Sequence, residues 1–252
     1  MTFAVIDDEG TTAKAIAGTP FTDPEYTGKE YALEDVRLLA PTLPSKVVAV
    51  GRNYADHVAE VFKQSSEHLP PTIFIKPSTA VVGPGAAIKI PEYATGVEFE
   101  GELALVVGVP CKNVKAADWK SVIRGVTIIN DVSSRDLQFA DGQWARAKGI
   151  DTFGPIGPWI ETDLEKFDFA NLPIKAHHTH NGVTETKQDS NSNQMIKSVG
   201  EMVEWVSESF TLLPGDVIAT GSPAGTAEMV PGDHIEVEIP GIGKLDNPVE
   251  RA

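Results

Sequence analysis

The run VEFEGELALVVG, residues 97–108, carries three alternating acidic residues, Glu98, Glu100 and Glu102. On a β-strand, residues two apart point to the same face, at a spacing of about 7 Å. The run becomes continuously apolar after Glu102, so we expect the carboxylates at the mouth of a buried strand, where they repel one another. A bound cation would relieve that repulsion. The pattern also fits a solvated edge strand whose glutamates face water.

A second polar group follows the apolar run GVTIIN. Asp131 ends that run, and Ser133 and Ser134 are typical of a helix N-terminus. If a helix begins there, Asp131, Arg135 and Gln138 lie near one face. The carboxylate suits a metal, whereas the guanidinium and the amide suit an anionic substrate. The spacing alone slightly favours the alternative, a surface ion pair between Asp131 and Arg135 with a small effect.

Two more segments carry residues that can move or hold a proton. Lys148 precedes Gly149 and a loop rich in Gly and Pro. It either caps a helix C-terminus or points into a cleft, where it stabilises a developing enolate. His57 and Glu60 share a helix face at i, i+3, so the carboxylate can orient the imidazole as a general base. Spacing alone favours an exposed ion pair there instead.

Two other patterns have simpler explanations. His177, His178 and His180 resemble a metal cluster, but they precede Asn181–Gly182, which predicts a type I′ hairpin and a solvated tip. Only His178 and His180 can share a face of that strand. The segment TGSP, beginning at Thr220, offers backbone amides and hydroxyls after a buried strand. It either binds a carboxylate or forms a turn.

These residues need a β-rich scaffold to position them. Short apolar runs bounded by Gly, Pro, Asp or Asn predict strands, namely VVAVG, TIFIKP, ELALVVGV, GVTIIND, IGPWI, DVIATG and HIEVEI. Helical patterns are fewer and cover residues 54–64, 116–123, 134–139 and 194–207. We therefore expect an α+β, mainly β domain over residues 45–252. Residues 1–44 form a small N-terminal segment, with a hairpin that turns at residues 8–10 and then a loose stretch.

Composition excludes several classes of function. The chain has 252 residues with 21 Lys plus Arg and 36 Asp plus Glu, a formal net charge of −15. That field repels phosphate backbones, so nucleic-acid binding is not expected. No apolar run is long enough to span a membrane, and the N-terminus has no secretory signal. The single cysteine, Cys111, favours a reducing, cytoplasmic location.

Taken together, the motifs resemble the fumarylacetoacetate hydrolase family over roughly residues 45–252. The segments that carry the resemblance occur in family order: GRNYADHVAE, FIKP, EFEGELALVVG, NDVSSRDLQ, KGIDTFGPIGPW, QDSNSNQMI, PGDVIATGSPAG and GIGKLDNPV. The resemblance implies a mixed, rolled β-sheet with the active site at one mouth, and a homodimer. TGSP replaces the TGTP of many relatives but retains a hydroxyl at Ser222.

The resemblance also implies a site. One Mg²⁺ or Mn²⁺ is expected on Glu100, Glu102 and Asp131, an all-oxygen set that suits a hard cation, with Glu98 outside that set. The family positions that hold or polarise the 2-oxo acid end of the substrate match four residues: Arg135, Gln138, Lys148 and Thr220. His57 and Glu60 match the His-x-x-Glu pair of short relatives acting on acylpyruvates and oxaloacetate.

The expected reaction is oxaloacetate decarboxylation to pyruvate and CO₂. Alternatives are acylpyruvate or fumarylpyruvate hydrolysis, and isomerisation or decarboxylation of 2-hydroxyhepta-2,4-diene-1,7-dioate. Both leading reactions break the C3–C4 bond of a 2-oxo acid and leave a pyruvate enolate; only hydrolysis needs an activated water. We also expect residues 54–70, which bury little, to close as a lid over bound substrate. A calcium-stabilised binding module is the non-enzymatic alternative, although no EF-hand loop is present.

Overall fold

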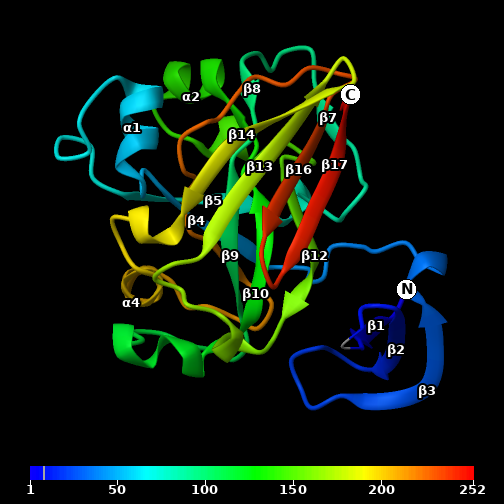
Figure 1. Cartoon of the computed structure of the whole chain (residues 1–252). Helices are drawn as coiled ribbons and strands as arrows, with labels where there is room; N and C mark the ends of the chain where they lie inside the picture. Colours follow the sequence, from blue (N-terminus) through cyan, green and yellow to red (C-terminus); the bar gives the residue numbers. More distant parts are fainter. Residues whose placement is uncertain (8) are drawn as a thin grey trace.

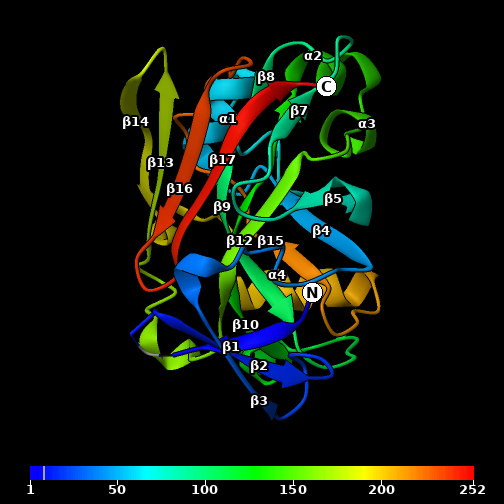
Figure 2. The same cartoon turned by 90° about the vertical axis from the view of Figure 1, so that its right-hand side faces the viewer.

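The computed structural model describes residues 1–7 and 9–252. Its strands form four sheets, and the two largest curl around a shared core (Figures 1 and 2). The seven-stranded sheet is mixed and has the order β5 (Thr72–Pro77), β4 (Lys46–Gly51), β15 (Val217–Ala219), β9 (Gly101–Val107), β10 (Ile123–Asn130), β12 (Gly154–Glu161) and β6 (Val81–Val82). The expected mainly β fold with a mixed, rolled sheet is confirmed.

The five-stranded sheet packs against the seven-stranded one. Its order is β14 (Val183–Asn191), β13 (Pro173–His180), β16 (His234–Ile239), β17 (Gly243–Arg251) and β7 (Ile88–Ile90). Side chains from both sheets, such as Leu103 and Val237, belong to one buried cluster. The other face of the seven-stranded sheet is also buried, because Val47 and Ala49 lie in a second cluster while Val48 and Val50 face the first. Burial on both faces explains why these strands read as continuous apolar runs.

The helices are short, as expected. They are α1 (Ala55–Phe62), α2 (Arg135–Asp141), α3 (Ala145–Lys148) and α4 (Val199–Ser209). Helices α1 to α3 gather at the end of the sheets away from the N-terminal strands (Figures 1 and 2). No helix in the described parts of the chain has the length and apolarity needed to cross a membrane.

Two helical predictions need correction. The helix predicted at residues 194–207 begins too early, because Ser198 caps α4 through a capping box with Glu201. The residues before it form a separate 3-10 helix, Ser192–Gln194. The segment predicted as helical at residues 116–123 is a 3-10 helix, Ala116–Ser121.

The N-terminal strands β1 (Phe3–Ile6), β2 (Thr12–Ala17) and β3 (Glu25–Ala32) form a separate antiparallel sheet. Pairing of β1 with β2 agrees with the predicted hairpin, and its turn at residues 8–10 includes Asp8, which lies outside the described residues. The stretch expected to be loose contains β3, so that prediction is wrong. Every residue of β3 is exposed, and it therefore lacks the alternation that signals a strand.

The hairpin predicted at Asn181–Gly182 is confirmed, since both residues have positive φ angles, 50° and 77°. Its histidines are not all solvated, however. His178 is buried, and its Nε2 lies 2.8 Å from Oδ2 of Asp233. His180 Nδ1 lies 2.7 Å from the other oxygen of Asp233. The expectation that only His178 and His180 cooperate is confirmed, and their shared partner ties the hairpin to the loop before β16.

Asp216, which precedes β15, joins the start of the large sheet to its centre. Its Oδ1 accepts hydrogen bonds from the Ser45 hydroxyl at 2.6 Å and the Ser45 amide at 3.1 Å, and its Oδ2 accepts one from Leu213 at 2.9 Å. Lys46 forms an ion pair with the same carboxylate. Burial raises the pKa of Asp216, but Lys46 and Ser45 lower it more, so the net shift is downward.

Asp216→Ala should therefore destabilise the fold by about 2–3 kcal/mol, because it removes a buried charged acceptor of several hydrogen bonds, which contribute about 1.5–3 kcal/mol when the acceptor is charged. Since the pKa of Asp216 is lowered, its contribution should be present above its ordinary pKa and lost as the pH falls through the lowered one. Urea unfolding at neutral pH measures the loss. Asp151→Ala, at an exposed position, is the control and should change stability by less than about 0.5 kcal/mol. A comparable change in both variants would contradict this role.

Candidate active site

A break between two strands brings the acidic residues together. The run predicted as one strand is divided into β8 (Val97–Glu98), which pairs with β11 (Ser133–Ser134), and β9, which begins at Gly101. At the break, the Asp131 amide donates to the Glu100 carbonyl at 2.8 Å, and the Glu100 amide donates to Oδ1 of Asn130 at 2.9 Å. Glu100 and Asn130 are 30 positions apart in the sequence. Their contact places Asp131, the residue after Asn130, beside Glu100.

Glu100, Glu102 and Asp131 form a buried carboxylate cluster. Each offers an oxygen that lies within 4.8 Å of an oxygen of the other two, and none of the three residues exposes more than 3% of its surface. The alternative of glutamates on a solvated edge strand is thus wrong for Glu100 and Glu102. Glu98 points elsewhere, because its Oε2 lies 2.7 Å from Nε of Arg135 and accepts a hydrogen bond from Thr226 at 2.8 Å.

Three cations surround this cluster. Nζ of Lys148 lies 2.8 Å from Glu100, 2.7 Å from Asp131 and 2.6 Å from the Ser133 hydroxyl. Nζ of Lys76, which is fully buried, lies 2.6 Å from the other oxygen of Asp131. Arg135 Nη2 lies 2.6 Å from Glu100 Oε1. Both simpler explanations for these residues are therefore wrong: Lys148 points to carboxylates rather than to a helix end, and Arg135 pairs with Glu98 and Glu100 rather than with Asp131.

The carboxylates have opposite electrostatic situations. Burial raises the pKa of Glu100, but Lys148 and Arg135 outweigh it and hold that pKa well below the usual range. Glu102 has no ion-pair partner among the described residues. Burial, together with the charges of Asp131 and Glu100, raises its pKa well above the usual range. Its Oε2 accepts a hydrogen bond from the Gly221 amide at 2.7 Å.

The cluster fits a hard divalent cation. All its donor atoms are carboxylate oxygens, the ligands that Mg²⁺ and Mn²⁺ prefer. Glu102 has no ion-pair partner among the described residues, and the neighbouring carboxylates outweigh the charge of Lys148 on it. Oε1 of Glu100 lies 2.6 Å from Arg135 Nη2 but is buried without a hydrogen-bond donor of acceptable geometry. A bound cation would satisfy both atoms. The residues present therefore suit such an ion.

Helix α1 brings the His57–Glu60 pair to the cluster. His57 is buried; its Nδ1 lies 3.4 Å from Oε2 of Glu60, and its Nε2 lies 3.6 Å from Oε1 of Glu100. The Gly225 amide holds Glu60, lying 3.1 Å from both carboxylate oxygens. Burial lowers the pKa of His57, but Glu100 and Glu60 raise it more. The alternative of an exposed pair is therefore wrong for His57.

The other predicted residues differ in their positions. Gln138 accepts a hydrogen bond from Arg135 Nη1 at 2.9 Å and lines the same pocket. Thr220 is buried behind the pocket, where its hydroxyl donates to the Leu103 carbonyl at 2.9 Å. Ser222, two residues later, lines the pocket instead. The structure thus brings together all the predicted residues except Thr220, whose side chain supports the backbone of β9.

The pocket is nearly filled by its own side chains. The remaining space is about 10 Å³, which is room for about one water molecule. This space is smaller than a 2-oxo acid. His57 and Val58 are buried, so the expectation that residues 54–70 bury little is wrong for these two positions. Closure of the segment over a substrate stays a prediction.

Sequence reasoning missed several residues of this pocket. Three of them, Arg52, Phe62 and Trp144, line the pocket. The fourth, Lys76, forms an ion pair with Asp131. A signal existed for Lys76, because a lysine at the end of the apolar run TIFIKP must place its charge somewhere inside the fold. Arg52 follows Gly51, the last residue of β4. The local sequence does not distinguish an arginine that enters a pocket there from one that lies on the surface.

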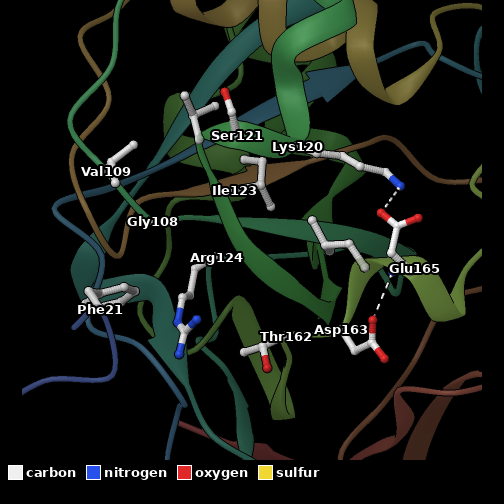
Figure 3. A pocket seen from close by; sticks show the side chains of 12 residues that line it. Phe21, Gly108, Val109, Lys120, Ser121, Ile123, Arg124, Thr162, Asp163 and Glu165 are labelled. Carbon is white, nitrogen blue, oxygen red and sulfur yellow. Dashed lines mark hydrogen bonds and ion pairs between the residues drawn. The ribbon is translucent and has the colours of Figure 1, made fainter. Parts of the chain in front are cut away.

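A larger hollow of about 470 Å³ lies elsewhere, between Phe21 of the N-terminal segment and residues of β10 (Figure 3). Lys120 and Glu165 face each other at its rim, 2.7 Å apart. Arg124 is held by the Pro20 carbonyl, which its Nε contacts at 2.8 Å. Asp163 and Glu165 also line the hollow, but Glu165 is paired with Lys120. Among residues 1–7 and 9–252, these two carboxylates belong to no group of three side chains that could hold a metal ion, unlike the carboxylate cluster.

Comparison with known proteins agrees with the resemblance in the motifs. The family model described as fumarylacetoacetate (FAA) hydrolase C-terminal matches residues 46–250, and one described as Rv2993c-like, N-terminal, matches residues 1–41. Protein Rv2993c of Mycobacterium tuberculosis is 51% identical, over 99% of this chain and 94% of that protein. The mitochondrial oxaloacetate tautomerase Fahd2a of Rattus norvegicus is 39% identical, over 85% of this chain and 69% of that protein.

Solved structures show the same fold. Cg1458 with an inhibitor is 74% identical, with a TM-score of 0.95 over 96% of this chain and 90% of that one. The 2-hydroxyhepta-2,4-diene-1,7-dioate isomerase of Mycobacterium marinum is 50% identical, with a TM-score of 0.84 over 95% and 88%. The maleylpyruvate hydrolase of Sphingobium sp. SYK-6, in complex with manganese(II) and pyruvate, is 30% identical, with a TM-score of 0.74 over 89% and 77%.

Proposed function

This chain belongs to the fumarylacetoacetate hydrolase family, and from that premise we propose that it is a divalent-metal-dependent enzyme that cleaves a 2-oxo acid, with oxaloacetate decarboxylation as its first candidate reaction. The observation that carries the proposal is the buried cluster of Glu100, Glu102 and Asp131, which faces His57, Arg135 and Lys148 in one pocket. Its relatives support the substrate class, since one is an oxaloacetate tautomerase and another was solved with manganese and pyruvate.

The proposed cofactor is Mg²⁺ or Mn²⁺ held by the three clustered carboxylates. When bound, the ion acts as a Lewis acid toward the carboxylate and keto oxygens of the substrate. Glu98 takes no part in this set, and its contacts with Arg135 and Thr226 give it a positioning role. We propose that Arg135, Gln138 and Thr220 hold the 2-oxo acid end, Arg135 and Gln138 directly and Thr220 through the backbone that it supports.

Lys148 supplies the positive charge that decarboxylation requires. In decarboxylation, the C3–C4 bond breaks, CO₂ leaves, and the bonding electrons form the enolate of pyruvate. Lys148, fixed by Glu100, Asp131 and Ser133, is positioned to stabilise the negative charge that develops on the enolate oxygen. The enolate then takes its proton at C3 from water, so decarboxylation does not depend on His57.

The second candidate reaction is acylpyruvate or fumarylpyruvate hydrolysis, and the His57–Glu60 contact of 3.4 Å is the observation that favours it. A carboxylate that orients an imidazole is what activation of water requires. Isomerisation of 2-hydroxyhepta-2,4-diene-1,7-dioate, as in the Mycobacterium marinum relative, needs only proton transfer and is the third candidate.

A substrate panel tests these reactions. Oxaloacetate, acetylpyruvate, fumarylpyruvate and 2-hydroxyhepta-2,4-diene-1,7-dioate are incubated with the protein and Mg²⁺, and the loss of each substrate's absorbance is followed. We expect the largest kcat/KM for oxaloacetate, with pyruvate and CO₂ as products. A larger value for an acylpyruvate would reassign the chain to hydrolysis. Protein that is inert toward all four at stoichiometric concentration would favour a metal-stabilised binding module.

His57→Ala should separate the two leading reactions within one protein. It should lower any acylpyruvate hydrolysis by about 10²-fold or more, because only that reaction needs an activated water, and oxaloacetate decarboxylation by much less. Both rates are measured on one preparation with saturating Mg²⁺. The matched control is Asp56→Ala, an exposed neighbour on α1. Equal losses in both reactions would mean that His57 serves binding, and unchanged hydrolysis would remove the pair from the mechanism.

We also propose the organisation that the sequence predicts. The boundary near Ser45, with a small segment at residues 1–44 and a catalytic domain at residues 45–252, is supported by the separate pairing of β1 to β3. A homodimer in the cytoplasm, acting on a small-molecule 2-oxo acid and on neither nucleic acid nor membrane, remains part of the proposal. Light scattering on the purified chain tests the dimer.

A further inference from the structure

Arg52 enters the pocket through an unusual backbone conformation. It follows Gly51, the last residue of β4, and has a φ of 61°, in the left-handed region that side chains with a Cβ seldom adopt. Gly51 is packed so closely that a Cβ there would lie 2.2 Å from Cζ3 of Trp144. The turn therefore needs glycine at position 51 and strain at position 52, and it directs Arg52 toward the pocket that both residues line.

Two aromatic rings hold the guanidinium. Cζ of Arg52 lies 5.3 Å from the ring centre of Trp144 and 5.9 Å from that of Phe62. The two rings are stacked on each other, with centres 6.2 Å apart and planes 21° apart. Cation–π contacts of this kind fix an arginine without using its hydrogen-bond donors. Phe62 comes from α1 and Trp144 precedes α3, so the guanidinium joins two elements of the pocket wall.

Among residues 1–7 and 9–252, no carboxylate pairs with the Arg52 side chain, and no acceptor forms a hydrogen bond with its guanidinium. The Nε of Arg52 is buried. The other cations of the pocket differ, because Arg135 is paired with Glu98 and Glu100, and Lys148 with Glu100 and Asp131. Burial lowers the pKa of Arg52, because its charge is less well solvated there than on an open surface.

We propose that Arg52 binds a second carboxylate of the substrate, at the end opposite its 2-oxo acid, and so makes the enzyme selective for dicarboxylic 2-oxo acids. This inference rests on the proposed function, in which the carboxylate cluster and its metal take the 2-oxo acid end. A planar guanidinium with open donors matches a carboxylate bidentately. A partner that arrives with the substrate satisfies the buried Nε, and a ligand with a methyl group in that place leaves it unsatisfied.

A consequence follows for the reaction when oxaloacetate is the substrate. The carboxylate that Arg52 holds is then the one that leaves as neutral CO₂. An interaction with that charge is strong in the bound substrate and weaker in the transition state, so it contributes to binding and not to the rate of the chemical step. Arg52→Met should therefore raise the KM for oxaloacetate by about 10-fold or more without lowering kcat for decarboxylation.

Calorimetry on the full chain loaded with Mn²⁺ tests the proposal directly. The probes are 2-oxoglutarate and 2-oxopentanoate, which have equal chain lengths and differ in the distal carboxylate. We expect the wild type to bind 2-oxoglutarate at least about 10-fold more tightly, the scale of a charge-assisted pair. Arg52→Met should abolish that preference and change the affinity for 2-oxopentanoate by less than about twofold. Arg52→Lys, which retains the charge without the planar fork, should fall between the two.

Controls separate the possible failures. Arg37→Met removes an exposed arginine of the N-terminal segment and should leave both affinities unchanged. The melting temperature of Arg52→Met confirms that the variant is folded, and methionine can retain the packing on Trp144. A wild type that binds both probes without preference, or a variant that weakens both alike, would overturn the role of Arg52 alone. A Mn²⁺-loaded wild type that binds neither 2-oxo acid, nor oxaloacetate in the kinetic measurement, would overturn the proposed function and this inference together.

Discussion

Glu102→Gln should abolish metal binding and catalysis while leaving the metal-free fold intact. The substitution removes one of three carboxylates that fit a divalent ion, and loss of a ligand should weaken Mn²⁺ binding by at least about 10²-fold, since loss of a residue that merely orients a ligand already costs 10- to 100-fold. The glutamine can still accept the hydrogen bond from the Gly221 amide. Calorimetric titration with Mn²⁺ and the rate of oxaloacetate loss measure the two effects.

Stability measurements give this prediction a second readout. Because the pKa of Glu102 is raised by burial and by the neighbouring carboxylates, its charged form destabilises the metal-free fold. The metal-free wild type should therefore lose stability as the pH rises through that raised pKa, and Glu102→Gln should not. Its melting temperature above that pH should equal or exceed that of the metal-free wild type.

Glu98→Gln is the matched control, because Glu98 lies in the same run of glutamates but outside the cluster. Its Mn²⁺ affinity should stay within about threefold of the wild type, a smaller change than the loss of a residue that orients a ligand directly.

Treatment of the wild type with EDTA should abolish activity, and Mg²⁺ or Mn²⁺ should restore it. Full activity in metal-free protein, or normal Mn²⁺ affinity in Glu102→Gln, would contradict the assignment of this cluster.

The elements that sequence predicts best are those whose burial leaves a local pattern. Strands β4, β9 and β10 are buried on both faces, so each reads as a continuous apolar run. Strand β3 escapes prediction, because all its residues are exposed and its pairing with β2 leaves no hydrophobic period. The division between β8 and β9 is also invisible, since it depends on pairing with β11.

The candidate site divides in the same way. Alternation predicts that Glu100 and Glu102 share a face, and the resemblance adds Asp131, but only the register of β9 against β10 brings Asp131 beside them. Arg52 and Trp144 both line the pocket because Gly51, which has no Cβ, lets the segment around Trp144 pack closely against the end of β4. Nothing in the spacing of residues 51–52 and 144 indicates that contact. Long-range contacts that leave no period in the sequence are those that sequence reasoning misses.

Lys148→Met should lower kcat for the proposed decarboxylation by about 10²-fold or more, the scale of one preorganised charge-stabilising donor. The substitution keeps the length of the side chain and removes the ammonium that lies 2.8 Å from Glu100 and 2.7 Å from Asp131. Those carboxylates raise the pKa of Lys148 by more than burial lowers it, so the group is positively charged at neutral pH and able to stabilise an enolate. Steady-state kinetics with saturating Mg²⁺ measure the loss.

The kcat of Lys148→Met, measured beside its Mn²⁺ affinity, distinguishes a catalytic Lys148 from a purely structural counter-ion. Since the ammonium competes with a metal for the same oxygens, its removal should leave Mn²⁺ affinity unchanged or slightly higher. Lys112→Met, at an exposed lysine remote in sequence from the cluster, is the control and should alter neither quantity. A Lys148→Met enzyme with ordinary turnover would mean that the lysine only neutralises Glu100 and Asp131 before the metal binds. A low kcat with normal Mn²⁺ binding and normal KM requires instead that its charge acts in the transition state, because uniform binding would change KM.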